Sequence, residues 1–458
     1  MSADVIVVGA GISGLSCAWG LERAGLSVHV LEAGPRAGGT IGSTREQGCL
    51  YETGPNSTLD TTPLIARMLD ELGIAGERQD ASPAAKNRYI LHHGKLVPLP
   101  MSPPAFLRTP LFSLGAKLRL LREPFIEKSA ADSEESVAAF VRRRLGPEFL
   151  DRAINPFVAG VYAGDPEKLS VRAAFPKLHA LEQQYGSLIR GQIKGAKARK
   201  ASGEQSKQTA TMFAFKDGMQ TLPDAIARRL ARLDTRARVR RLAMTKAGWQ
   251  AVVDAPGGGR EYDARAIVLA VPAYAAASLV SPYAITTAGS LEDIRYPPVG
   301  IVASLYRKGT IAHPLDGFGF LVPQVEGRRV LGTIFSSTLF SGRAPDGYDL
   351  LTTFVGGMRQ PDQAKLPAAE LAAMVQAEHA SILGAPPQAE STRVVQWERA
   401  IPQYTAGHLE RIANIESTEH DRPGLFFCAN YRGGVSVGDC IKAADAMATR
   451  VAGFLRGA

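Results

Sequence analysis

The sequence has few of the residues on which metal, disulfide and nucleophilic sites depend. Four cysteines occur among 458 residues, without CxxC spacing: Cys17, Cys49, Cys428 and Cys440. No His/Cys cluster has metal-ligand spacing, and neither a Ser/His/Asp order nor a motif of paired carboxylates is present. We therefore expect no metal, free thiols in a reducing compartment and no hydrolase triad. His92 and His93 are expected in an exposed hairpin turn rather than as catalysts.

Long apolar runs are missing as well. No stretch of roughly 18 or more apolar residues occurs, so we expect no membrane-spanning helix. The first apolar stretch, residues 4–8, runs directly into a glycine turn, which is not the pattern of a signal peptide. These features predict a cytoplasmic protein and leave peripheral contact with the inner face of a membrane open.

The charge balance is basic. Lys and Arg total 53 against 44 Asp and Glu, a net charge of +9. Such an excess suits anionic substrates, anionic lipid heads or nucleic acid without choosing among them. No basic stripe interleaved with aromatic residues is present, so nucleic acid is the least favoured partner. Residues 191–209 are polar and basic, which predicts a solvent-exposed loop.

The most specific motif lies in the first 32 residues. An apolar strand at residues 4–8 leads into a turn in which Gly9, Gly11 and Gly14 have the GxGxxG spacing. A helix pattern and a second strand follow, and this strand ends at Glu32. The glycines allow a tight turn, backbone approach to a pyrophosphate and close packing of helix on sheet, while the acid accepts ribose hydroxyls. The sequence therefore predicts dinucleotide binding.

Two further turns decide which dinucleotide is bound. Glu32 would repel the 2′-phosphate of NADP, which leaves NAD and FAD. Residues 33–40 form a second glycine loop that contains a cation, Arg36, and residues 52–56 form a third small-residue turn. A nicotinamide fold does not require these loops, whereas they resemble the pattern of flavoproteins of the glutathione-reductase and amine-oxidase type. Three such turns within about sixty residues favour FAD.

The end of the chain repeats the order of strand, glycine turn and helix. An apolar run at 425–429 leads into a glycine-rich turn and a helix at 439–455. The N-terminus of this helix could direct its dipole toward the pyrimidine end of a flavin. We also expect helices at 62–72, 134–145, 222–233 and 371–383, and strands at 86–91, 94–99, 213–217 and 264–272.

These patterns predict an α/β fold, α+β overall, in three parts. A discontinuous Rossmann-like FAD-binding domain of the amine-oxidase type would comprise residues 1–85, 210–277 and 415–458. A helical domain that covers the substrate or lies on a membrane surface would span 86–209, because short apolar helices there carry basic residues. A mixed-sheet substrate domain would span 278–414.

Several segments resemble the oxygen-dependent, FAD-containing protoporphyrinogen oxidase family. The strongest match is residues 155–170. Others are spread in order over the whole chain: 86–90, 317–323, 331–337, 401–404, 407–409 and 430–440. The resemblance implies oxidation of protoporphyrinogen IX to protoporphyrin IX in haem biosynthesis, with six electrons removed in three flavin turnovers and passed to O₂ to give H₂O₂.

The resemblance also implies roles for individual residues. Arg88 would pair with a substrate propionate, Leu305, Leu321 and Phe335 would enclose the tetrapyrrole, and the backbone carbonyl of Gly160 would lie near the reacting edge. Together with the glycine motifs it implies this set for non-covalent FAD: Gly9, Gly11, Ile12, Ser13, Gly14, Glu32, Ala33, Arg36, Gly39, Thr40, Gly54, Pro55, Asn56, Ser57, Val239, Trp397, Val435, Ser436 and Val437.

Alternatives stay open at this point. Coproporphyrinogen III carries four propionates and would need more cations. Another flavin oxidase of the same fold, acting on amines or carotenoids, is a second alternative, and a carrier of porphyrin or flavin without turnover is a third. Expected partners are the porphyrinogen, O₂, a membrane surface, ferrochelatase as recipient of the product, and a second copy in a homodimer.

Overall fold

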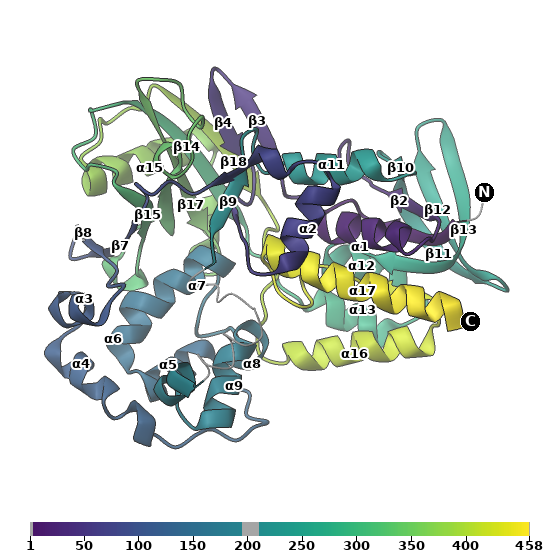
Figure 1. Cartoon of the computed structure of the whole chain (residues 1–458), viewed down its shortest axis with the longest axis horizontal. Helices are drawn as coiled ribbons and strands as arrows, with labels where there is room; N and C mark the ends of the chain where they lie inside the picture. Colours follow the sequence, from purple (N-terminus) through teal and green to yellow (C-terminus); the bar gives the residue numbers. More distant parts are fainter. Residues whose placement is uncertain (1–2, 195–209, 458) are drawn as a thin grey trace.

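The computed structural model of the chain describes residues 3–194 and 210–457. The described residues form two seven-stranded sheets, two smaller sheets and a helical region. Figure 1 shows the two sheets side by side and the helical region, with α5 and α9, at one end of the molecule.

The first sheet joins both ends of the chain. Its strand order is β10-β2-β1-β13-β12-β11, with β19 paired to β13. β1 (Ala3–Val8), β2 (Val28–Leu31), β13 (Gly258–Leu269) and β19 (Leu425–Phe427) pair in parallel. β1, β2, β19 and residues 266–269 of β13 are apolar and largely buried, as strands covered on both faces must be. The other members are β10 (Leu233–Asp234), β11 (Arg238–Thr245) and β12 (Gly248–Ala255).

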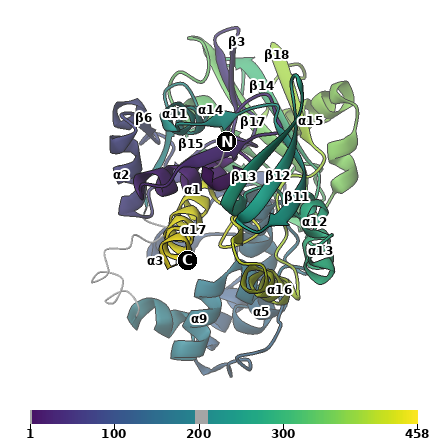
Figure 2. The same ribbon diagram turned by 90° about the vertical axis from the view of Figure 1, so that its right-hand side faces the viewer.

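Two helices from opposite ends of the sequence pack on this sheet. α1 (Ile12–Arg23) follows the first glycine turn and α17 (Val437–Gly457) closes the chain. They lie side by side in Figures 1 and 2, and a Cβ on Gly20 would come within 2.9 Å of the Ala448 Cβ. The helix that the sequence predicted at 439–455 thus begins two residues earlier, at Val437. α12 (Ala273–Val280), α13 (Ile285–Glu292) and α16 (His408–Asp421) form a further layer.

The second sheet has the order β18-β14-β17-β16-β15-β7-β8. Its bounds are β18 (Ser391–Trp397), β14 (Val299–Arg307), β17 (Tyr348–Gly356), β16 (Gly332–Phe335), β15 (Gly317–Leu321), β7 (Asn87–His92) and β8 (Lys95–Pro98). The hairpin β7-β8, which the sequence grouped with the helical domain, pairs with β15 instead. Only residues beyond this hairpin therefore begin the helical region; the other predicted domain boundaries stay predictions. α15 (Ala368–Leu383) covers one face.

The helical region is built from short helices, four of which begin at a serine cap. Ser102, Ser113, Ser136 and Ser170 each accept a backbone N–H at a helix start, which replaces a missing intrahelical bond. The region comprises α3 (Pro103–Arg108), α4 (Leu114–Leu120), α5 (Val137–Arg144), α6 (Pro147–Phe149), α7 (Asn155–Tyr162), α8 (Val171–Ala174) and α9 (Pro176–Tyr185). Residues 188–194 are also helical, which corrects the loop expected from 191; residues 195–209 lie outside the described residues.

The remaining elements connect these parts. The predicted helices near 62–72 and 222–233 are α2 (Pro63–Glu71), which Thr62 caps, and α11 (Thr221–Arg229). Small strands complete the chain: β3 (Ser43–Glu46), β4 (Cys49–Glu52), β5 (Thr58–Leu59), β6 (Arg78–Asp80) and β9 (Met212–Phe215), with the one-turn α14 (Ser336–Leu339) after β16. Among the described residues, no helix combines the length and low charge needed to cross a bilayer.

Candidate functional site

The first glycine turn has the geometry that the sequence predicted. Gly9 has a φ of +103°, and a Cβ there would lie 2.7 Å from the Ala270 carbonyl oxygen. A Cβ on Gly14 would lie 2.0 Å from the Gly9 oxygen, so both positions exclude side chains for packing reasons. A Cβ on Gly11, by contrast, would meet no atom within 4 Å. Gly11 therefore leaves open space beside the N-terminus of α1, where Ile12 and Ser13 begin the helix and no side chain of the described residues caps the first-turn N–H groups.

Glu32 ties this turn to the second glycine loop. One carboxylate oxygen accepts the Ala10 N–H at 2.7 Å, and the other accepts the Gly34 N–H at 2.7 Å. A Cβ on Gly39 would lie 3.2 Å from the Gly11 Cα, so the two loops face each other closely. Ala33, Gly39 and Thr40 are exposed or partly exposed beside them. The acid thus both shapes the turn and stands where ribose hydroxyls would be accepted.

Arg36 supplies a cation to the second loop. Its guanidinium donates to the carbonyls of Ala37 and Ile41 and to the Gln220 side chain at 3.0, 2.7 and 2.6 Å. Among the described residues no carboxylate forms an ion pair with it. Its charge is therefore available to phosphate groups, which arginine binds through a planar fork.

The third turn meets the second loop and the second sheet. A Cβ on Gly54 would lie 2.2 Å from the Thr40 carbonyl oxygen, and the Asn56 amide donates to the Gly54 carbonyl at 3.1 Å. Trp397, at the end of β18, donates its indole N–H to the Thr53 carbonyl at 2.7 Å. This bond brings a residue of the second sheet against the cofactor loops. Pro55 and Ser57 are partly buried beside it.

The later cofactor candidates reach the same region from two directions. The N–H groups of Arg236 and Ala237 donate to the carbonyls of Gly34 and Glu32 at 2.8 Å each, which holds the chain just before Val239 against the second loop. At the C-terminus, Ser436 accepts the Asp439 N–H at 3.2 Å and so caps α17. Val435 precedes this cap and Val437 opens the helix. The carboxyl ends of β1, β2 and β19 thus share one edge with two helix N-termini, the usual place for a ligand in such sheets.

Three of the predicted substrate residues come together. A Cβ on Gly160 in α7 would lie 2.7 Å from the Leu321 Cδ2, so the two residues touch. Arg88 pairs with Gly319 in the β7-β15 ladder, and Ile90 pairs with Leu321. Arg88 and Leu321 therefore point to the same face of the sheet. Arg88 is exposed, and its guanidinium carbon lies 5.9 Å from the Phe318 ring centre.

Phe335 and Leu305 lie elsewhere. Phe335 is fully buried on the α15 side of the second sheet, with its ring centre 5.5 Å from that of His313. Its neighbour Ile334 points to the opposite face, because alternate side chains of a strand face opposite ways. Leu305 packs under β4 with Cys49 and other apolar residues. Neither side chain offers surface to a ligand beside Gly160 in this structure.

An apolar cluster that the sequence did not single out lies against α7 instead. Ala159, the neighbour of Gly160, packs with Ile301 and Leu331, and Phe354 and Trp397 join the same cluster. Alternate residues of a strand share a face, so Ile301 lies on the same face of β14 as Val299. This alternation is the signal from which the sequence could have indicated the cluster. These side chains are better placed than Phe335 and Leu305 to shape the space beside α7.

One cluster could in principle hold a metal, contrary to the spacing argument. Ligand atoms of His92, His93 and Glu326 lie within 4.8 Å of one another. However, both Glu326 oxygens accept backbone N–H groups of the hairpin turn, from His93 at 2.9 Å and Gly94 at 3.2 Å. The Arg152 guanidinium contacts the His92 ring, and burial and this charge lower the His92 pKa. The Arg152 guanidinium would repel a metal ion bound to His92. We therefore interpret the contacts of Glu326 as support for the hairpin turn.

The sequence matches one family over most of its length. Residues 12–452 match the family of flavin-containing amine oxidoreductases. The chain belongs to this family. It is 36% identical to a chloroplastic protoporphyrinogen oxidase of Nicotiana tabacum over 99% of this chain and 86% of the relative. It is 27% identical to a coproporphyrinogen III oxidase of Bacillus subtilis, with 95% of each chain covered. The tobacco relative confirms the resemblance to the protoporphyrinogen oxidase family.

Solved structures confirm the fold. A structure from Exiguobacterium sp. 255-15, provisionally described as a protoporphyrinogen oxidase, has a TM-score of 0.81 at 22% identity and 98% coverage of both chains. Cyclohexylamine oxidase from Brevibacterium oxydans has a TM-score of 0.70 at 18% identity and 99% coverage of both chains. The fold is that of FAD-dependent amine oxidases, as the sequence predicted, and the chain is an FAD-dependent oxidoreductase.

The residues present fit FAD. The open side of Gly11 is a cradle that a Cβ would fill, and it faces the N-terminus of α1 as a pyrophosphate site requires. Glu32 flanks it, as does Arg36, which forms no ion pair with any described residue; these are the charges that ribose and phosphate need. The individual cofactor contacts remain predictions of this arrangement.

Proposed function

We propose that this protein oxidises protoporphyrinogen IX to protoporphyrin IX in haem biosynthesis, with non-covalent FAD, O₂ as electron acceptor and H₂O₂ as product. The likeness to the tobacco protoporphyrinogen oxidase over nearly the whole chain is the observation that carries this proposal. Coproporphyrinogen III is the second candidate substrate, because the Bacillus subtilis relative is named for it at a lower identity of 27%.

The residues near Gly160 suit a large tetrapyrrole that must be oriented rather than activated. FAD, when bound, takes up two electrons per cycle and passes them to O₂. Leu321 and the bare backbone of Gly160 offer apolar surface at one edge. Arg88 has no carboxylate partner among the described residues, and its fork matches a propionate. These residues would hold the substrate over the cofactor and exclude water, which is most of what hydride transfer needs.

The cysteines favour non-covalent FAD. All four are buried, and Cys440 lies nearest the last glycine turn, with its thiol 3.8 Å from the Gly434 carbonyl. Burial raises the pKa of Cys440 to about 12. The thiol therefore stays protonated at neutral pH and is a poor nucleophile toward a flavin.

We also propose that the helical region rests on a membrane surface. Four large apolar side chains on or beside α3 and α4 are 69–82% exposed: Leu107, Leu114, Leu121 and Phe125. A group of this kind is unusual on a protein surface, where exposed apolar side chains are normally scattered singly. Arg108 and Arg122 are exposed in the same segment and could meet anionic lipid heads. Apolar side chains rimmed by cations are typical of surfaces that lie in a lipid interface.

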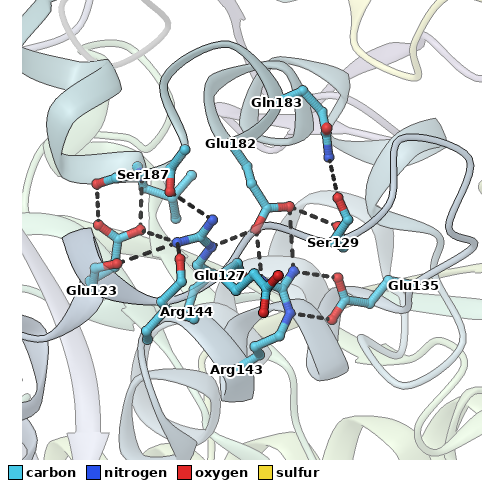
Figure 3. A network of polar contacts seen from close by, with 12 residues as sticks. Glu123, Glu127, Ser129, Glu135, Arg143, Arg144, Glu182, Gln183 and Ser187 are labelled. Atoms are coloured by element: carbon cyan, nitrogen blue, oxygen red, sulfur yellow. Dashed lines mark hydrogen bonds and ion pairs between the residues drawn. The ribbon is translucent and has the colours of Figure 1, made fainter.

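A buried ionic network holds this surface in place (Figure 3). Arg144, with no exposed surface, donates to Glu182 at 2.5 Å and to Glu123 at 3.2 Å. Glu123 also accepts the Ser187 hydroxyl at 2.5 Å and the Leu188 N–H at 2.8 Å, where residues 188–194 begin a helix. The network thus joins the segment after α4 to α5, α9 and the helix at 188–194.

Three further expectations from the sequence are not tested by the structure or the comparisons. Transfer of the product to ferrochelatase, a homodimer and a cytoplasmic location remain predictions.

Turnover of both porphyrinogens, side by side in air, tests the function. We expect porphyrin fluorescence to rise faster with protoporphyrinogen IX, with H₂O₂ formed in proportion. A faster rise with coproporphyrinogen III would move the assignment to the second candidate, and no rise with either would refute both.

Co-sedimentation with vesicles containing anionic lipid tests the membrane contact, and Leu121→Glu combined with Phe125→Glu should abolish it without loss of turnover in detergent.

A further inference from the structure

Residues 401–404 and 407–409 resemble the protoporphyrinogen oxidase family, and three polar residues of this segment are deeply buried. Tyr404 and His408 are 3% and 2% exposed, and Gln403 is 1% exposed. Polar groups are buried so completely only where partners compensate the lost water. The partners of these residues therefore show what the segment does.

Tyr404 is bound to the loop that leads into α17. Its hydroxyl donates to the Asn430 carbonyl at 2.7 Å and accepts the Gly434 N–H at 3.0 Å. The two bonds span the turn in which Gly433 and Gly434 have φ values of +86° and +121°. One phenol thus closes the turn that places Val435, Ser436 and Val437 at the helix start.

His408 supports the same loop from the side of α16. Its ring stacks on Tyr404 with centres 4.1 Å apart and planes at 12°. Nε2 lies 2.9 Å from the Tyr431 carbonyl oxygen, so this nitrogen carries the proton and donates. Burial lowers the His408 pKa to about 4, and the ring therefore stays neutral and keeps this tautomer at physiological pH.

The segment also reaches the substrate side. The Gln403 side-chain amide donates to the Tyr162 carbonyl at the end of α7 at 2.8 Å, and the Ser170 N–H donates to the Tyr404 carbonyl at 2.9 Å. α7 carries Gly160. One short segment therefore connects the helix beside the expected substrate with the loop beside the expected flavin.

We propose that Tyr404 and His408 are positioning residues for the flavin: they fix the loop 430–437, and thereby set how tightly FAD binds and how readily the flavin accepts electrons. This inference rests on the assignment of the α17 N-terminus to the flavin. The first-turn N–H groups of α17 can stabilise negative charge on a reduced ring only while the loop holds them in place.

Tyr404→Phe tests the inference because it keeps the ring and the stack but removes both hydroxyl bonds. We expect the FAD dissociation constant, measured by titrating apoprotein, to rise about tenfold, as for the loss of an ordinary hydrogen bond. The flavin midpoint potential should shift to more negative values, and kcat should fall with little change in KM. His408→Phe, which keeps an aromatic stack but cannot donate to Tyr431, should change the same quantities in the same direction.

Tyr306→Phe is the matched control. Tyr306 is also buried, and its hydroxyl lies 3.1 Å from the His379 ring, on the α15 side of the second sheet. The control should keep the wild-type FAD dissociation constant and potential. If folded Tyr404→Phe and His408→Phe proteins bind FAD within about twofold of wild type and keep its potential, the inference is overturned. A wild type that binds FAD but oxidises neither porphyrinogen would refute the proposed function while leaving this comparison valid.

Discussion

Gly11 shows how one absent side chain can serve a ligand rather than the fold. Gly9 and Gly14 are required by neighbouring backbone, whereas a Cβ on Gly11 meets nothing within 4 Å. Gly11→Ala should therefore fold normally but lose FAD, because the methyl group would occupy the pyrophosphate cradle. Absorbance of purified protein and apoprotein melting measure the two effects. Gly289→Ala, also in open space, is the control, and a Gly11→Ala protein that retains its flavin would contradict the cradle.

We expect substrate recognition to depend most on Arg88. It is exposed before the substrate binds, so its loss should leave stability unchanged. Arg88→Ala should raise KM for the porphyrinogen about 10- to 100-fold, the effect of losing a hydrogen-bonded charge pair of about 1.5–3 kcal/mol. Arg88→Lys should recover part of this loss, because lysine keeps the charge but not the fork. Steady-state kinetics with an unchanged KM for Arg88→Ala would reject the role.

Sequence reasoning at this scale succeeded where the chemistry is local. Glu32 lies a fixed distance after a glycine turn, so its place could be predicted from spacing alone. Phe335 could not be placed in this way, because which face of β16 points to α7 depends on strand pairing distant in sequence. Leu305 shares a face of β14 with Ile301 but lies four residues further along, where β4 covers it, and this too depends on distant contacts. The contact of Tyr404 with Gly434, thirty residues away, likewise leaves no local signal.

At the scale of elements, the helices of the helical region depend on buried charge. Burial alone would raise the pKa of Glu182, but hydrogen bonds from Arg143 and Arg144 hold it below its ordinary value. The carboxylate therefore stays ionised inside the helical region. The sequence predicted the helix at 134–145 from its apolar period, yet it gave no sign that Arg144 faces inward.

Arg144→Met should destabilise the helical region strongly. The change leaves Glu123 without its cation and weakens the pairing of Glu182, which costs about 3–5 kcal/mol for a buried pair. Urea denaturation and limited proteolysis measure the loss. Arg142→Met is the neighbouring control, because Arg142 pairs with Glu167 at the surface and should cost under about 1 kcal/mol. Equal effects of the two substitutions would show that the network contributes little.

At the scale of the whole molecule, buried histidines make stability depend on pH. Burial lowers the pKa of His379 to about 3 and that of His408 to about 4, and the pKa values of His29, His92, His179 and His313 are also lowered. The unfolded chain takes up protons near pH 6.5, whereas the folded chain does not. Unfolding is therefore favoured as the pH falls below about 6.5.

Between about pH 6 and 5, each histidine that is neutral in the folded chain and protonated in the unfolded chain should lower the free energy of unfolding by about 1.4 kcal/mol per pH unit as the pH falls. Urea denaturation at several pH values measures this slope. His379→Gln should reduce the slope by about one proton. A flat profile between pH 7 and 5 would contradict the prediction.

The two ends of the chain meet in the first sheet. β1, from the beginning of the chain, and β19, from near its end, pair with β13 on opposite sides. This closure was predictable from two strand–glycine–helix patterns. How the second sheet and α7 then lie against it was not, because Trp397 and Gln403 make their contacts far along the chain.

Anaerobic mixing of the purified protein with protoporphyrinogen IX tests the central claim most directly. The account predicts a yellow protein whose flavin absorbance bleaches on mixing, returns when O₂ is admitted, and leaves fluorescent porphyrin and H₂O₂. A colourless protein that FAD cannot reconstitute, or a bound flavin that the porphyrinogen does not bleach, would contradict it.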